Sequence, residues 1–462
     1  MKNRVAEFRA QLAREFAARF PRSAVLGATR GERLLDQTSH AVRWAEPFQL
    51  TAARADGAAF TDVDGHRILD YWQGHYANVL GHNPALIRDA LTERLEAGGG
   101  LQSGLIHAIE GEVAELVTRL TRTDTVRFTT SGALATFYAV LLARAATGRS
   151  RILKVSGGWH GSQPFALKGV SARGGSFDHL ESEGLPGTTE RDVELVRFND
   201  VEALERLFAD HGGQLACFLV EPWLGSGGGI AATPEFLRAA RRLTQQHGAL
   251  LLCDEIISGF RFRAGDLTAM YGVAPDLLIL GKVMGGGMPV AAVAGRRAVM
   301  ELCSRSLRRV KFEGGTYSAH ELSLIAARTM LNHLARDEHA IYGRLAVQGE
   351  RLRSGIERLC RELSIGAWIS GWGNAAVPGS SIVMVHLANG AGGRPDSAET
   401  LARGAHRHAG DELLKSVLLL EGVSVRHGLG APSMAHTDSD LDATLVAYRK
   451  ALLRLREARL VG

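Results

Sequence analysis

Between residues 84 and 330, short apolar runs alternate with stretches whose apolar residues recur at helical spacing. Strands that are joined through helices predict a mainly parallel sheet with both faces covered, and therefore an α/β fold. Strands are expected at residues 125–130, 152–156, 216–221, 249–254, 277–281 and 291–295. The clearest helices between them are expected at residues 132–147 and 234–247.

The segments on either side of this region predict a second, smaller α+β unit. An amphipathic helix over residues 4–20 and an extended arm over 21–50 precede a hairpin that turns at Asp64-Gly65. Further helices and strands follow the alternating region. We therefore divide the chain into an N-terminal segment that joins the small domain, a large domain and a C-terminal small domain, at residues 1–83, 84–330 and 331–462.

Two of the expected strands end in a residue that bears charge. The run Leu277–Leu280 leads to Lys282 and a glycine loop, and the run Ala249–Cys253 leads to Asp254. A charged amine is costly beside apolar residues, and a lysine, unlike an arginine, can lose its proton and act as a nucleophile. A strand-end acid followed by a strand-end lysine is the arrangement that holds pyridoxal 5′-phosphate. Lys282 and Asp254 are therefore candidate catalytic residues.

Small or polar residues follow three further strands. Ser131 and Gly132 open the helix at 132–147, where backbone N–H groups and the helix dipole favour a phosphate. An ordinary serine N-cap would give the same local pattern. Trp159, after the strand at 152–156, could stack on a cofactor ring or belong to the core. Glu221 places another carboxylate at a strand end.

Composition argues against several other classes of protein. The net charge of +5 comes from arginines dispersed among acidic residues, without a nucleic-acid-binding motif, so no nucleic-acid partner is expected. No apolar stretch reaches membrane-spanning length, and the four cysteines lack metal-type spacing. The N-terminal helix carries Glu7 and Glu15, which is not typical of a signal or transit peptide. We expect a cytoplasmic enzyme with neither a membrane segment nor a metal.

Taken together, these segments resemble the class III (subgroup II) pyridoxal-phosphate-dependent aminotransferases of fold type I. Within that family they are similar to the branch that contains glutamate-1-semialdehyde 2,1-aminomutase and the β-amino-acid transaminases. The likeness runs from about Phe48 to the C-terminus. It is carried by DVDG at 62–65, LGHNP at 80–84, SGALA at 131–135, WHG at 159–161, VEP at 220–222, CDEIISGFR at 253–261, APDLLILGKVMGGGMPVAA at 274–292 and GGTYS at 314–318.

The resemblance implies a seven-stranded sheet in the large domain and a homodimer with shared active sites. Lys282 would form a Schiff base with the cofactor and then move a proton between substrate and cofactor, while Asp254 would keep the pyridine nitrogen protonated. Thr316 would reach the phosphate from the neighbouring subunit. The residues that the resemblance assigns to cofactor binding are Ser131, Gly132, Ala133, Trp159, His160, Glu221, Asp254, Ile256, Lys282 and Thr316.

The chain departs from the family pattern at several positions. SG[ST]EA becomes SGALA, so Ala133 lacks a hydroxyl group and Leu134 lacks a carboxylate. One neutral hydrogen bond contributes about 1 kcal/mol, which other phosphate donors can supply. Gln102 stands near a serine of the aminomutase, and His75 stands where relatives carry an aromatic residue of the substrate cleft.

Four residues are candidates for substrate binding. Arg43 matches roughly the place of a carboxylate-binding arginine, Arg426 falls in a stretch that lines the cleft in relatives, and His75 and Gln102 complete the set. We expect an aminotransferase that exchanges an amino group, by ping-pong chemistry, between an amino acid or amine and a keto or aldehyde acceptor. An aminomutase, a racemase or a decarboxylase is the alternative. A cofactor-binding protein without turnover is a third hypothesis, against which the intact lysine and aspartate argue.

Overall fold

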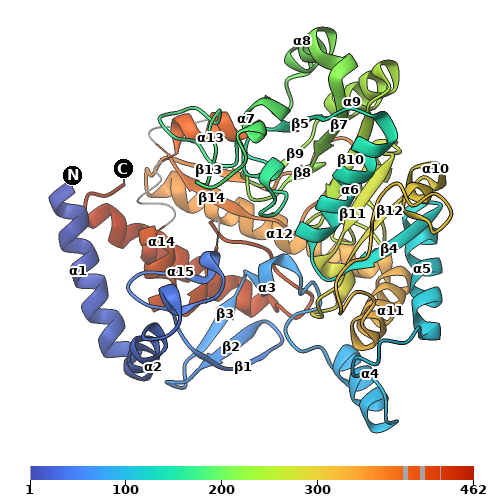
Figure 1. The fold of residues 1–462 in the computed structure, drawn as a ribbon. Helices are drawn as coiled ribbons and strands as arrows, with labels where there is room; N and C mark the ends of the chain where they lie inside the picture. The colour runs from blue at the N-terminus through green and yellow to red at the C-terminus, as the bar shows by residue number, and fades with distance from the viewer. Residues whose placement is uncertain (1, 389–393, 406–411, 427, 462) are drawn as a thin grey trace.

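A computed structural model describes residues 2–388, 394–405, 412–426 and 428–461 (Figure 1). Its centre is a seven-stranded sheet with the order β4-β12-β11-β10-β7-β5-β6. β12 runs antiparallel to β4 and β11, and the other neighbouring pairs are parallel. The strands are β4 (Thr125–Thr129), β5 (Arg151–Val155), β6 (Val193–Val196), β7 (Leu215–Val220), β10 (Leu250–Glu255), β11 (Leu277–Leu280) and β12 (Ala291–Gly295). The α/β fold with a mainly parallel sheet is confirmed.

The local pattern predicted every strand of this sheet except β6. β6 is four residues long, lies at the edge of the sheet and pairs with β5 alone. Its two middle residues, Glu194 and Leu195, are only partly buried. An edge strand needs no continuous apolar run because it is not enclosed on both sides, so the sequence carries little signal for it.

Helices cover both faces of the large sheet (Figure 1). One face packs against α6 (Gly132–Thr147), and the other packs against α5 (Ala108–Thr121), α8 (Val201–His211), α9 (Pro234–His247) and α11 (Glu321–Arg336). Along β10, Leu252 joins the core under α6, while Cys253 joins the opposite core. Because successive strand residues point to opposite faces, Asp254 and Glu255 also diverge.

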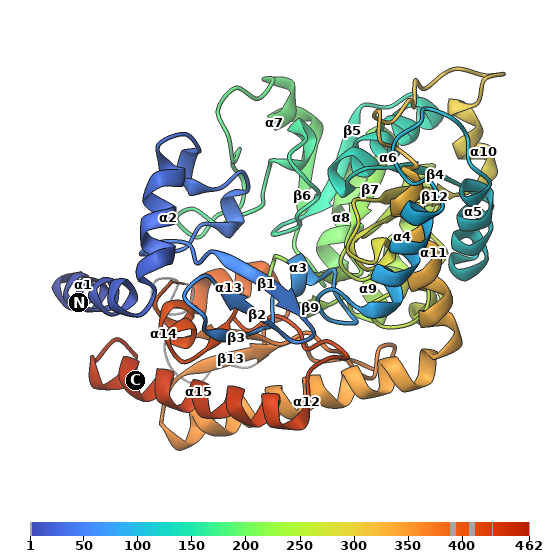
Figure 2. The same cartoon turned by 90° about the horizontal axis from the view of Figure 1, so that it is seen from below.

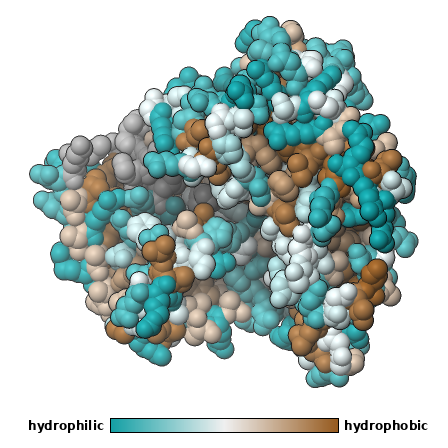
Figure 3. Space-filling view, in the orientation of Figure 1, coloured by the Kyte–Doolittle hydropathy of each residue, from teal (hydrophilic) through white to brown (hydrophobic). Residues whose placement is uncertain are grey.

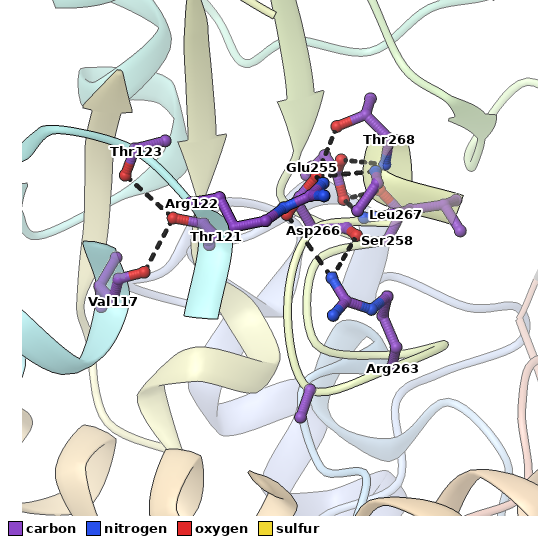
Figure 4. A network of polar contacts seen from close by, with 12 residues as sticks. Val117, Thr121, Arg122, Thr123, Glu255, Ser258, Arg263, Asp266, Leu267 and Thr268 are labelled. Atoms are coloured by element: carbon purple, nitrogen blue, oxygen red, sulfur yellow. Dashed lines mark hydrogen bonds and ion pairs between the residues drawn. The ribbon is translucent and has the colours of Figure 1, made fainter. Parts of the chain in front are cut away.

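Glu255 belongs to a buried polar network away from the α6 face (Figure 4). Its carboxylate accepts hydrogen bonds from the backbone N–H groups of Leu267 at 2.6 Å and Thr268 at 2.9 Å. Asp266 caps the same turn and lies 3.8 Å from Arg122. Burial, with the nearby Asp266 charge, raises the pKa of Glu255 to about 8. Glu255 therefore stabilises a turn, and only Asp254 of the pair is directed to the α6 face.

A second sheet, of order β1-β2-β3-β15, lies beside the terminal helices. Its β2–β3 hairpin turns at Asp64-Gly65 as predicted, with φ of +93° at Gly65. The smaller strands are β1 (Ala52–Asp56), β2 (Ala59–Asp62), β3 (Arg67–Asp70), β8 (Trp223–Leu224), β9 (Ile230–Ala231), β13 (Ala367–Ser370), β14 (Met384–Leu387) and β15 (Val423–Ser424). The other helices are α1 (Lys2–Arg19), α2 (Pro21–Gly31), α3 (Gln73–Tyr76), α4 (Ala85–Glu96), α7 (Thr188–Asp192), α10 (Arg297–Met300), α12 (Glu338–Glu362), α13 (Ala398–Gly404), α14 (Leu414–Leu420) and α15 (Asp438–Glu457).

The extended arm predicted from residue 21 was wrong over its first part, because residues 21–31 form α2. Pro21 occupies the first helical turn, where its fixed φ and missing N–H favour the start of a helix. Phe8, Leu12 and Phe16 of α1 share one buried core with residues of α12, α14 and α15. α12 and α15 run side by side along one edge of the molecule (Figure 2). The domain boundaries at residues 83 and 330 stay a prediction.

No helix in the described part of the chain has both the length and the apolar character needed to cross a membrane. The four cysteines are buried and free.

Candidate active site

A cavity of about 610 Å³ opens where β4, β5, β7, β10 and β11 end, and we call it the Lys282 cavity. The edge that the carboxyl ends of parallel strands form is where such sheets bind ligands. Most of the residues that the sequence singled out line this cavity: Arg43, His75, Ser131, Gly132, Ala133, Trp159, His160, Glu221, Asp254, Ile256 and Lys282.

Lys282 follows β11 and begins a short 3-10 turn, with φ of +46°. This left-handed conformation is sterically unfavourable for a residue with a side chain, and such strain is found mainly at functional sites. Burial lowers the pKa of Lys282 to about 8, against the opposing effect of the Asp254 and Glu221 charges. The amine is therefore neutral, and nucleophilic, at a pH where an ordinary lysine is still charged.

Asp254 is held by two hydrogen bonds in a buried position. Its Oδ2 lies 2.8 Å from Nδ1 of His160, and its Oδ1 accepts from the backbone N–H of Ile256 at 3.0 Å. Burial lowers the pKa of His160, so a neutral imidazole donates its Nδ1–H to the carboxylate. The carboxylate is thereby fixed in orientation and can pair with a protonated ring nitrogen in the cavity.

Glu221 and Trp159 form a neighbouring part of the wall. The Glu221 carboxylate accepts from the backbone N–H groups of Trp159 at 3.0 Å and Gly225 at 2.9 Å. Burial, with the Asp254 charge, raises the pKa of Glu221 to about 8. The Trp159 side chain lines the cavity and is 40% exposed, so Trp159 is not a core tryptophan. An exposed indole on a cavity wall suits an aromatic ring as its ligand.

Neighbouring residues pack closely against the N-terminus of α6 at two glycines. Ser131 Oγ accepts from the N–H of Leu134 at 3.3 Å, which makes Ser131 the N-cap. A Cβ on Gly132 would lie 2.8 Å from Ile256 Cδ1, and one on Gly161 would lie 2.5 Å from Ala133 Cβ. Glycine is therefore required at position 161, where φ is also +89°, and a side chain at position 132 would displace Ile256. A small residue at 133 leaves room for the loop that carries Gly161. A helix N-terminus lined by small residues suits a phosphate group.

One supporting residue escaped the sequence analysis. Lys154, in β5, is fully buried, and its Nζ donates to the carbonyls of Gly158 at 3.1 Å, Ala166 at 2.9 Å and Lys168 at 2.8 Å. These bonds anchor the loop that presents Trp159. The signal was a single lysine inside the apolar run of residues 152–155. Other lining residues that were not named as site candidates include His40, Asn78, Thr130, Ser162 and Met288.

Three sequence candidates lie away from this cavity. Gln102 and Thr316 line a separate cavity of about 550 Å³, the Gln102 cavity, where Gln102 Nε2 donates to the Thr316 carbonyl at 2.5 Å. The Arg426 guanidinium donates to the backbone carbonyls of Arg43 at 3.0 Å and Trp44 at 3.1 Å. In this chain, Arg426 anchors the segment that carries Arg43.

The lowered pKa of Lys282 predicts how the rate of covalent cofactor attachment depends on pH. Only the neutral amine attacks an aldehyde, so the rate for apoprotein should fall about tenfold for each pH unit below 8 and level off above it. Stopped-flow absorbance of the cofactor measures this rate, with Nα-acetyl-lysine as the reference amine. A rate that climbs steadily to pH 10, as for the reference, would contradict the lowered pKa.

The residues fit pyridoxal 5′-phosphate, because an amine, a carboxylate and a helix N-terminus line one cavity, and these groups suit its aldehyde, its ring nitrogen and its phosphate. The fold and this site define a pyridoxal-phosphate-dependent enzyme of fold type I. A family model described as "Aminotransferase class-III" matches residues 40–374. The chain belongs to the class III aminotransferase family, and its cofactor is pyridoxal 5′-phosphate.

Individual relatives agree with this assignment. Glutamate-1-semialdehyde 2,1-aminomutase of Thermomicrobium roseum is 36% identical over 411 residues, which cover 87% of this chain and 90% of the relative. An omega-transaminase from Sphaerobacter thermophilus superposes with a TM-score of 0.85 at 30% identity, covering 95% of this chain and 98% of that one. A β-phenylalanine aminotransferase from Variovorax paradoxus has a TM-score of 0.85 at 30% identity, covering 99% of each chain.

Proposed function

We propose that the protein is an aminotransferase that takes an amino group from an amino acid and delivers it to a keto or aldehyde acceptor. The observation that carries this proposal is that Lys282 and Arg43 line one cavity. Within the described residues, the Arg43 side chain has no hydrogen bond or ion pair. A free guanidinium at the mouth of a reactive cavity suits a carboxylate, which it binds through two parallel hydrogen bonds.

The side chains around the cavity have separate roles in this reaction. Bound pyridoxal 5′-phosphate supplies an aldehyde that condenses with amines and a ring that accepts electrons from the substrate carbon. Lys282 Nζ, once free of the cofactor, removes and returns the proton at the substrate carbon. Asp254 holds the proton on the ring nitrogen, and His160 keeps Asp254 in place. Trp159, which lines the cavity, would cover the cofactor ring and exclude water from that side.

A half-reaction assay tests the proposal. The cofactor-loaded enzyme is mixed with single amino acids, without an acceptor, across a panel of α-, β- and ω-amino acids. An aminotransferase releases one keto product per active site and leaves the cofactor in its aminated form, which absorbance records. If no amine in the panel gives a stoichiometric keto product, the aminotransferase proposal is wrong.

A second candidate is an aminomutase, which moves an amino group within one molecule. The Thermomicrobium roseum relative, which bears the aminomutase name and is 36% identical, favours it. An aminomutase consumes its substrate without net release of a keto acid and without stable conversion of the cofactor. Glutamate-1-semialdehyde supplied as sole substrate therefore separates the two candidates, because only the second converts it continuously without an acceptor.

Replacing Arg43 should weaken recognition of acidic substrates selectively. Arg43→Leu removes a charge-assisted pair worth roughly 1.5–3 kcal/mol, so KM for carboxylated substrates should rise about 10- to 150-fold. KM for simple amines should change little. Arg43→Lys should recover only part of the loss, because lysine keeps the charge and lacks the planar fork.

The control for this experiment is Arg14→Leu, which removes an exposed arginine on α1 that does not line the Lys282 cavity. Equal effects of Arg43→Leu on acidic and neutral amines would refute carboxylate recognition by Arg43. The substrate would then be a neutral amine, an amino sugar or an aminocyclitol.

We further propose that the enzyme is a homodimer with shared active sites. Leu101, Leu105 and Ile106 are 75%, 76% and 90% exposed, and the segment they form borders the Gln102 cavity. Apolar residues also lie at the lower right of the face in Figure 3, among hydrophilic ones. Exposed apolar clusters mark interaction surfaces, and twofold homodimers are the commonest assembly. Thr316, which lies off the Lys282 cavity of its own chain, is then free to serve the neighbour.

Ile106→Glu should shift the protein toward monomer and weaken cofactor binding together, because a charge at the interface loses its hydration. Sedimentation velocity and cofactor titration measure the two effects. The matched control is Val446→Glu, which places the same charge at a 55% exposed site on α15. A monomeric Ile106→Glu protein with the parent's cofactor affinity would contradict shared active sites.

A further inference from the structure

The segment α3 is a single left-handed turn rather than an ordinary helix. Its φ angles are +45° at Gln73, +61° at Gly74, +61° at His75 and +68° at Tyr76. Consecutive residues with side chains avoid this conformation because Cβ approaches the following carbonyl oxygen. Such a turn persists only where its surroundings impose it, and it is found mainly at functional sites.

Contacts on both sides hold this turn in place. At its start, the Asp70 carboxylate accepts from the backbone N–H groups of Trp72 at 3.2 Å and Gln73 at 2.9 Å. His82 Nε2 lies 2.9 Å from the same carboxylate. At its end, the buried Arg261 guanidinium donates to the Tyr76 carbonyl. The turn is therefore clamped between a buried acid and a buried cation, and its strain has a structural consequence.

That consequence is the position of His75. Its ring lies 3.9 Å from the Trp72 ring and 4.6 Å from the His40 ring, between centroids. The Arg426 guanidinium lies 5.3 Å from the centroid of the Trp72 ring. Burial, with the nearby His40 and Arg43 charges, lowers the pKa of His75 to about 3, so the ring is neutral. The planes of the three rings are tilted against one another by 46° and 50°, and we call this row of rings the ring wall.

The ring wall stands between two cavities. His75 and Arg43 line the Lys282 cavity and also a neighbouring cavity of about 670 Å³ beside the N-terminal arm, which we call the arm cavity. The arm cavity is lined by apolar side chains that include Phe48, Leu50 and Leu419, and by charged side chains that include Arg30, Asp70 and Arg426. No hydrogen bond of a described residue reaches two buried amide atoms of its lining, Gln37 Oε1 and Gln49 Nε2. The arm cavity therefore offers room next to the Lys282 cavity, and the His75 ring lies at the boundary of the two.

We propose that His75 determines substrate length: its ring closes the Lys282 cavity and restricts the enzyme to short amino acids whose carboxylate reaches Arg43. This inference rests on the proposed function, since it names the substrate class of the same site. The left-handed turn directs the His75 side chain toward the boundary between the two cavities. Without the ring, the two cavities would merge into one elongated pocket.

Binding of carboxylic acids without an amino group tests this proposal. Isothermal titration of the cofactor-loaded enzyme compares propionate, 3-phenylpropionate, 5-phenylpentanoate and 7-phenylheptanoate. The parent should bind the two shorter acids and lose affinity for the two longer ones. His75→Gly should bind 5-phenylpentanoate at least tenfold more tightly than the parent, and each further buried methylene should tighten binding about fourfold. Affinity for propionate, which is too short to reach the arm cavity, should change much less than affinity for the two longer acids.

Two properties of the variants allow the result to be interpreted. Glycine is comfortable at φ of +61°, so His75→Gly relieves backbone strain and is expected to fold. His75→Phe keeps a ring at the boundary and should retain the length limit of the parent. The proposal is overturned if the glycine variant keeps the parent's length profile, if the phenylalanine variant loses it, or if propionate changes as much as the long acids.

The acids contain no amine, so these results do not depend on transamination. A protein that fails the half-reaction assay but shows the expected length profile would refute the proposed function alone. A protein that passes that assay and shows no change in the profile would refute the role of His75 alone.

Discussion

Lys282→Ala is expected to lower turnover by about 10⁴-fold or more, because one side chain is both the covalent anchor of the cofactor and the base that moves the substrate proton. The structure supports both roles, since the amine lies in the cavity with a pKa lowered to about 8. Single-turnover kinetics with a donor amino acid measure the loss. Cofactor is still expected to bind, because the α6 N-terminus and Asp254 remain.

Borohydride reduction followed by peptide mapping provides the complementary measurement. In the parent protein the pyridoxyl label should appear on Lys282, and it should disappear in the alanine variant. Lys311→Ala is the matched control, because Lys311 is exposed and, among the described residues, forms an ion pair only with the nearby Glu313. A label on any other lysine of the parent would show that the anchor has been assigned to the wrong residue.

Asp254→Asn is expected to lower kcat by about 10²- to 10³-fold, the cost of removing one preorganised group from a site of developing charge. An amide cannot hold a proton on the ring nitrogen, so the ring becomes a poor acceptor of electrons. The amide still accepts from Ile256 N–H, so the fold around it should persist. Cofactor absorbance should show that the lysine is still attached, which separates lost chemistry from lost binding.

Glu255→Gln is the informative control for Asp254, since it alters the adjacent carboxylate on the opposite face of β10. It removes an acceptor from a buried network, so it should lower the free energy of unfolding by about 1–3 kcal/mol. Turnover per folded molecule should stay within about twofold. If Glu255→Gln lowers kcat as much as Asp254→Asn, the separation of the two carboxylates by strand alternation is wrong.

Local sequence patterns predicted the strands whose burial requires a continuous run of apolar residues. β7, β10 and β11 are enclosed on both faces, so their runs contain almost only apolar residues. β6 at the edge escaped notice because it is only half enclosed, and α2 because its apolar residues are few and partly exposed. The turn at Gly65 was also predicted, because its sequence signal lies in two adjacent residues, Asp64 and Gly65.

The sequence by itself determined the chemistry of the protein. A lysine and an acid at strand ends, with small residues at the start of a helix, identify the cofactor because each signal lies within a few residues of the chain. Tertiary structure alone decided which side chains share a cavity. Arg43 and His75 come from the N-terminal segment and join Lys282, whereas Thr316 and Gln102 meet elsewhere. The left-handed turn at His75 was also invisible, because contacts with Asp70 and Arg261, the latter more than 180 residues away along the chain, overcome the local preference of its backbone.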